Sequence, residues 1–209
     1  MLHIVYGEHL LESLVYKPVI EILENLEGIV LVRFPYPYDY NYRREILKKI
    51  SAYVRKEYLE FPTKPKRPFI YPKDLTLHLH STPPPKVETM PRVYFLILLF
   101  NPNIPEPVYQ AIINFRNERF VPIPGAEEKS TFLTLEFCLG FTFPECLALS
   151  RFFNLKVRDI ERISDILPFV VYPDLFPKEV RDIIQRGQRK RNKLVQIAAK
   201  LIKRIADAV

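Results

Sequence analysis

The sequence has 209 residues, of which 48% are apolar and 26% are charged, and its formal net charge is +7. This balance is typical of a globular chain and excludes an intrinsically disordered one. The longest apolar run, 93–100, is far shorter than the roughly 18 residues of a membrane span, so we expect no membrane-spanning helix.

The first part of the chain predicts a strand–helix–strand unit. Residues 2–6 form a short apolar run, and apolar residues then recur at helical spacing over 9–26, with Pro18 as a kink. Gly28 ends this helix, and the apolar run 29–34 is typical of a buried strand. Because a helix connects the two strands, we expect them to pair in parallel.

Tyrosines follow at alternate positions of a proline-rich segment: Tyr36, Tyr38, Tyr40 and Tyr42. An extended row of tyrosines can stack on nucleic-acid bases, although tyrosines of such loops more commonly cover the edge of a core. An amphipathic helix is predicted over 42–59, and the proline-rich residues 60–73 are typical of a surface connection.

The middle of the chain predicts the rest of a sheet. Residues 75–80 alternate between Leu and polar side chains, and 93–100 is the most apolar run, so we expect these two strands to be neighbours. A helix over 107–118 and a strand over 131–137 follow. The predicted fold class is α/β or α+β, a mixed sheet of about five strands with flanking helices in a domain of residues 1–140.

Residues 141–209 are predicted to form a basic helical segment. Thr142 and Glu145 have the spacing of a capping box, and Pro144 suits the first turn of a helix. Asn154 tolerates the left-handed conformation of a tight corner, and a second helix is predicted over 157–167.

These residues resemble the helix-turn-helix superfamily of DNA-binding proteins. The apolar positions, and the small residue at which the helices would cross, are Leu149, Ser150, Phe153, Leu155, Ile160 and Ile163. Asn154 stands where the family prefers Gly. The family usually has another helix just before the pair, whereas a strand is predicted here, so a winged arrangement or a bundle completed by the final helix would be needed.

The resemblance implies that the second helix binds DNA. It would present Lys156, Arg158 and Arg162 outward, with Glu161 between them. Arginine can read guanine through two hydrogen bonds, and lysine can hold phosphate. The alternative is an ordinary helical hairpin with a charged outer face.

The net charge of the protein comes from its last part. Residues 1–150 contain 17 Lys or Arg and 17 Asp or Glu, whereas residues 151–209 contain 14 and 7. A long helix from Pro177, with a kink at Gly187, carries a dense group of cations: Arg186, Arg189, Lys190, Arg191 and Lys193. We expect this group to bind nucleic-acid phosphates, with DNA as the first candidate.

Two other partners fit a basic amphipathic helix. It could lie on an anionic membrane, but it lacks the aromatic anchors of such helices, which argues against a membrane. Its apolar side could also pack against a second copy of the chain and form a homo-oligomer. A self-associating structural or virion protein that packages nucleic acid is therefore a third interpretation, after DNA binding and the enzyme described next.

A single pattern suggests catalysis. His78 and His80 lie two apart on a predicted strand, where their imidazoles could share a metal. The pattern resembles the metal motif of the HUH nicking and replication-initiation endonucleases, which implies a nucleophilic tyrosine, either Tyr109 or Tyr53. The lysine that normally follows the tyrosine is missing after Tyr109. Half-exposed strand histidines are the commoner interpretation, so we assign no catalytic residue, metal or cofactor.

Composition also bears on location and source. The N-terminal residues include two glutamates by position 12 and no basic region, so we expect no signal peptide and a cytoplasmic protein, with a virion as the alternative. Cys138 and Cys146 are more typical of buried thiols than of ligands, and a disulfide between them is the alternative. Twenty prolines, five glycines and no tryptophan are compatible with a thermophilic source.

Overall fold

A computed structural model describes residues 1–7, 9–34, 41–60, 76–82, 95–100, 105–108, 110–111, 114, 134–138 and 141–208. Tyr36, Tyr38, Tyr40 and Tyr109 lie outside these ranges, as do most of the proline-rich connection and much of the helix predicted over 107–118. Within the described ranges, no helix has the length and apolar character needed to cross a membrane.

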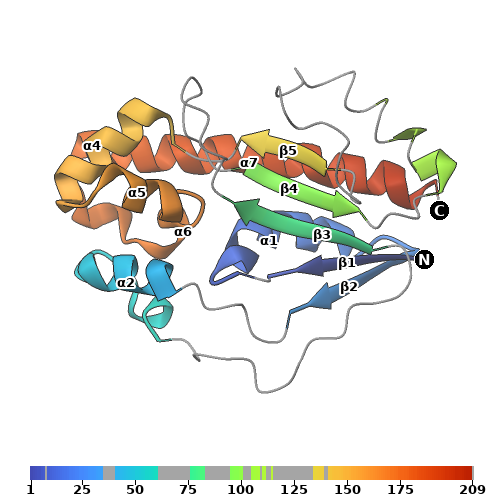
Figure 1. Ribbon diagram of the computed structural model, residues 1–209, viewed down its shortest axis with the longest axis horizontal. Coiled ribbons are helices and arrows are strands. Elements are labelled where there is room, and N and C mark those ends of the chain that lie inside the picture. The colour runs from blue at the N-terminus through green and yellow to red at the C-terminus, as the bar shows by residue number, and fades with distance from the viewer. Residues whose placement is uncertain are drawn as a thin grey trace.

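The fold is mixed α/β, as predicted, with one mixed sheet (Figure 1). Its strands are β1 (Leu2–Tyr6), β2 (Ile29–Arg33), β3 (Thr76–Thr82), β4 (Phe95–Phe100) and β5 (Thr134–Cys138), in the order β2-β1-β3-β4-β5. The parallel pairing of β1 with β2 confirms the predicted strand–helix–strand unit. β1 also pairs in parallel with β3, and the expected pairing of β3 with β4 is antiparallel.

Two helices cover one face of this sheet. α1 (Glu12–Leu23) and α7 (Lys178–Ala206) lie behind it in Figure 1 and contact each other. Leu77 and Leu79, the apolar positions of β3, are fully buried, and α1 contacts that strand. The buried residues of α1 and α7 belong to a single hydrophobic core. Residues of both predicted segments, 1–140 and 141–209, therefore share one core.

Short helices gather at one end of the sheet (Figure 1): α2 (Asn41–Lys49), η1 (Lys56–Tyr58), α4 (Phe143–Phe153), α5 (Val157–Ile163), α6 (Leu167–Val170) and η2 (Pro173–Leu175). Two predicted helices were too long. The one over 42–59 ends at Lys49. The chain then forms turns over 50–53, and Val54 makes an antiparallel bridge with Val171. The one over 157–167 ends at Ile163, and a turn separates it from α6.

Gly187 does not interrupt α7, contrary to the predicted kink. The helix runs continuously through this position, and the ring of Phe141 packs against it. A Cβ atom on residue 187 would lie 2.4 Å from Cε1 of Phe141, whose side chain is fully buried. Gly187 therefore permits close packing of Phe141 on the helix.

We expect Gly187→Ala to destabilise the protein. Alanine is the better helix former by about 1 kcal/mol, but overpacking typically costs about 1–3 kcal/mol, and the ring that would have to move is fully buried. Urea unfolding followed by circular dichroism measures the difference, with Gln196→Ala on the exposed side of α7 as the control. If Gly187→Ala raised the free energy of unfolding, the close contact with Phe141 would not be the reason for a glycine at this position.

Candidate nucleic-acid interface

The start of α4 has the geometry predicted for it. The backbone N–H of Thr142 donates to Oε2 of Glu145 at 2.8 Å, within a capping box, and a proline occupies the first turn. These contacts satisfy backbone groups that a helix start leaves unpaired. The predicted N-terminus is confirmed.

The corner after α4 is also confirmed. Asn154 adopts the left-handed conformation, with φ of 53°, and is exposed. The N–H of Leu155 donates to the carbonyl of Ser150 at 2.9 Å, which is typical of a helix that ends in a left-handed residue. α4 and α5 contact each other as a helical hairpin.

The outer face of α5 is covered, in contrast to the prediction. The guanidinium carbon of Arg162 lies 4.8 Å from the ring centroid of Tyr42, which belongs to α2, and Glu161 is only 8% exposed. The expectation that both side chains face outward is therefore wrong. Among residues 156–163, Lys156 and Arg158 are the exposed ones. α2 packs on α5, so part of the surface of this helix is covered by the protein itself.

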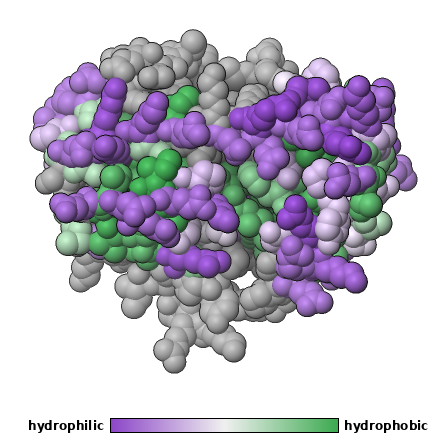
Figure 2. All heavy atoms as spheres, turned by 180° about the vertical axis from the view of Figure 1, so that it is seen from behind, coloured by the Kyte–Doolittle hydropathy of each residue, from purple (hydrophilic) through white to green (hydrophobic). Residues whose placement is uncertain are grey.

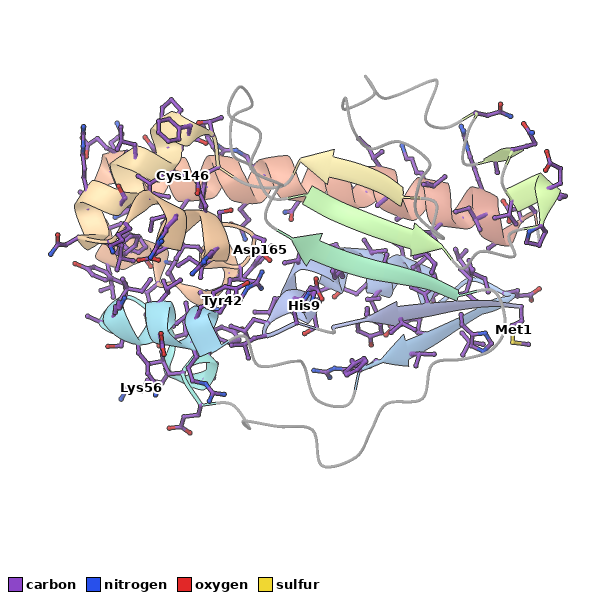
Figure 3. All side chains as sticks on the ribbon, in the orientation of Figure 1. Met1, His9, Tyr42, Lys56, Cys146 and Asp165 are labelled. Atoms are coloured by element: carbon purple, nitrogen blue, oxygen red, sulfur yellow. The ribbon has the colours of Figure 1, made fainter. Side chains whose placement is uncertain are left out.

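A buried ion pair holds the junction between α2 and α5. Nη2 of Arg43 lies 3.0 Å from Oδ2 of Asp165, and the two side chains are 1% and 0% exposed. Nη1 of Arg43 also donates to the carbonyl of Leu10 at 3.1 Å. Figure 3 shows Asp165 and Tyr42 in this junction, with His9 on the side of the sheet. The pair thus joins α2, the turn after α5 and the segment before α1.

A second buried carboxylate closes the start of α1. Glu12 is fully buried, and its two oxygens lie 3.1 Å from the backbone nitrogen and from Nδ1 of His9. Glu12 is the acidic residue of the first turn of α1, the position at which a carboxylate side chain interacts favourably with the helix dipole. The N-terminus of α1 is therefore occupied by the protein's own carboxylate.

One side of α7 is cationic and exposed. Its exposed charged positions include Arg186, Arg189, Lys200 and Lys203, whereas Ile184 and Ala198 on the other side are buried. The sequence from 185 to 206 contains eight Lys or Arg and no Asp or Glu. Figure 2 shows hydrophilic side chains along the helix on the face opposite to that of Figure 1.

The predicted cations of α7 differ in their surroundings. Nε of Arg186 lies 3.4 Å from Oε1 of Glu145, a residue of α4. The side chain of Arg186 is 52% exposed, so it also contacts the solvent. Arg189 is exposed. The side chains of Lys190, Arg191 and Lys193 lie outside the described part of the chain.

Sequence reasoning missed Lys200 and Lys203, which extend the cationic side beyond residue 193. Positions 186, 189, 193, 196, 200 and 203 follow one another at intervals of three or four, the spacing of one helix face. The dense group of cations ends at residue 193, whereas the spacing of one helix face continues to residue 203. We call Arg186, Arg189, Lys200 and Lys203 the α7 row.

The residues of the predicted catalytic pattern lie on β3 and in an aromatic cluster. His78 and His80 pair with Leu99 and Ile97 on the middle strand, β3, but their side chains are not among those described. Tyr53 packs in an aromatic cluster, with ring centroids 5.3 to 5.5 Å from those of Phe152, Phe153 and Phe176. Its ring thus serves packing. The described residues contain no group of three or more His, Cys, Asp or Glu able to hold a metal ion.

Cys146 is a buried, free thiol. Burial raises its pKa to about 12, and the charges of Glu161 and Glu145 add to the effect. A thiol that stays protonated at neutral pH is a poor nucleophile and a poor metal ligand. Cys146 is therefore a packing residue, while the side chain of Cys138 lies beyond those that are described.

No protein-family model, curated protein or solved structure matches the chain. The protein can therefore be classified only by its own fold and by the charge of its surface. It is a mixed α/β protein in which one long helix is buried on one side and cationic on the other.

Proposed function

We propose that the protein binds double-stranded DNA through the α7 row. The observation that carries this proposal is the charge of one exposed helix side, on which cations recur for five turns in a sequence without a carboxylate from 185 to 206. Duplex DNA carries one negative charge per about 1.7 Å of its axis, and cations that neutralise it release condensed counterions. The α7 row offers such a polyanion a set of fixed positive charges.

The burial of α7 argues against the two other partners considered for it, a membrane and a second copy of the chain. A helix that binds a membrane surface inserts its apolar side among the lipids, and a self-associating helix buries that side against a copy. In this protein the apolar side of α7 is already in the core, where Ile184, Leu201 and Ile205 are at most 1% exposed. The predicted homo-oligomer through this apolar stripe is therefore not supported.

The α4–α5 hairpin has a smaller part in the proposal. Lys156 and Arg158, exposed around the first turn of α5, are positioned to add phosphate contacts. Arg162 is stacked on Tyr42 and is left out of the interface. The hairpin resembles a helix-turn-helix at its corner, but the packing of α2 restricts its use.

The proposal predicts a change in salt dependence when the α7 row is neutralised. In Arg189→Ala/Lys200→Ala/Lys203→Ala, loss of three phosphate contacts reduces the slope of log affinity against log salt by about 2.7, or 0.9 per contact. Fluorescence anisotropy of a labelled duplex of about 30 base pairs, between about 50 and 200 mM salt, measures this slope.

A matched control removes the same charge elsewhere. Lys48, Lys49 and Lys56 are exposed on α2 and η1, so their triple alanine variant has the same net charge as the α7 variant. We expect the control to keep a slope close to that of the unmodified protein. Equal slopes in all three proteins would contradict the proposal, and so would binding to anionic liposomes without binding to DNA.

A further inference from the structure

We infer that the α7 row recognises the backbone of a nucleic-acid duplex without regard to sequence, and that it prefers a duplex to a single strand. This inference rests on the proposed function and specifies the class of ligand. It follows from the shape of the row, from the side chains that it lacks, and from the way in which α7 is embedded in the fold.

The α7 row lies on one continuous helix that packs against other elements of the fold. Arg186 and Lys203 are separated by 17 positions of one continuous helix, which corresponds to about 26 Å at 1.5 Å per residue. The opposite side of the helix is held by contacts with α1, α4 and α6. A duplex of that length presents about 15 phosphates, roughly twice the charge of one strand. A line of exposed cations on a continuous, packed helix is therefore suited to a stiff and densely charged ligand.

The row offers no surface for stacking bases. α7 contains no aromatic residue, and its described exposed positions between 185 and 203 are Gln, Arg, Asn and Lys. Proteins that bind single strands combine a cationic groove with aromatic side chains on which the unpaired bases stack. Because a single strand would gain no stacking here and meets the cations with fewer phosphates, it should bind more weakly than a duplex.

The described helices that could read bases are both restricted. A recognition helix must enter the major groove, which is about 12 Å wide, with its side chains pointing at base edges. α7 is flanked by α1 and α4, so only one side of it projects. On α5, Arg162 is held by Tyr42 and Asp159 is only 9% exposed. Contacts should therefore reach phosphates and leave base edges unread.

The test compares ligands for the unmodified protein at one salt concentration. We expect duplexes of unrelated sequence, including AT-rich and GC-rich ones, to bind with affinities within about threefold, whereas base reading typically separates specific from non-specific sites by about 10³ or more. The matching single strands should bind at least about tenfold more weakly. The α7 triple variant should weaken all duplexes by the same factor.

The outcomes separate this inference from the proposed function. If one duplex bound about 10³-fold more tightly than the others, or if single strands bound as tightly as duplexes, the inference would be overturned while binding through α7 stood. A change of duplex preference in Lys156→Ala/Arg158→Ala would overturn it as well, because the hairpin would then read bases. Failure to bind any nucleic acid at low salt would overturn both.

Discussion

An Asp165→Ala variant is expected to lose about 3–5 kcal/mol of its free energy of unfolding. Asp165 is fully buried, and its carboxylate faces the guanidinium of Arg43, which stays charged at any pH that the fold tolerates. Without the carboxylate, Arg43 keeps its bond to the carbonyl of Leu10, but its positive charge remains in the interior uncompensated by this partner. The loss is a large part of the roughly 5–15 kcal/mol that stabilises a typical domain.

Urea unfolding of the variant, followed by circular dichroism, tests this expectation. Two controls separate charge burial from loss of contact. Lys17→Ala removes one partner of an exposed pair, where both side chains are more than half exposed, and should cost about 0.5 kcal/mol or less. Arg43→Met/Asp165→Leu removes both charges and should recover much of the loss. A cost for Asp165→Ala no greater than that for Lys17→Ala would contradict the role of the pair.

Phe153→Ala is the second variant with a large expected effect, a loss of about 3–5 kcal/mol. Phe153 is 8% exposed, and its ring centroid lies 5.4 Å from that of Tyr53, 5.1 Å from Phe152 and 5.8 Å from Phe176. These rings come from α4, from the segment after α2 and from the approach to α7. Truncation leaves a cavity at the point where the three segments meet.

Thermal and urea unfolding of Phe153→Ala measure this loss, and two milder variants act as controls. Phe153→Leu fills part of the cavity and should cost clearly less. Tyr53→Phe keeps the ring and removes the hydroxyl, so it should change stability by roughly 1 kcal/mol or less. A small loss in Phe153→Ala, comparable to that of Tyr53→Phe, would show that the aromatic cluster does not hold these segments together.

The sequence predicts well the features that depend on local contacts. The capping box at Thr142 and Glu145 and the left-handed corner at Asn154 are formed by residues at most five positions apart, so their patterns are visible in the chain. The alternating residues of β3 and the apolar residues of β4 likewise specify two neighbouring strands. The residue types of these segments are enough to explain why each segment adopts its secondary structure.

The covered face of α5 could not be predicted in this way. Arg162 stacks on Tyr42, and Asp165 pairs with Arg43 across 122 positions of the chain. A charged residue next to a helix looks the same in the sequence whether water or another helix covers it. The end of α2 at Lys49 was not predicted either, because the helical pattern continues in the sequence, and the bridge between Val54 and Val171 joins residues far apart in the chain.

The α7 row could be predicted from the sequence in part. Its three- and four-residue spacing is present in the sequence, but the burial of Ile184 and Ala198 is what shows which side of the helix faces outward. The pairing of Arg186 with Glu145 depends on how α4 lies against α7, and no local pattern indicates it. The location and spacing of the cationic segment are thus visible in the sequence, whereas the outward side of the helix and the partner of Arg186 are not.

The contact between α1 and α7 has a consequence for synthesis of the protein. α1 ends at Leu23 and α7 begins at Lys178, so a growing chain must add 154 residues before the first turn of the covering helix exists. Until then the apolar side of α1 lacks the helix that shields it, and the ribosome holds a nascent chain with an incomplete interior. Closure of so distant a contact is slow compared with helix formation, so we expect α1 and α7 to pack together only after most of the chain has been made.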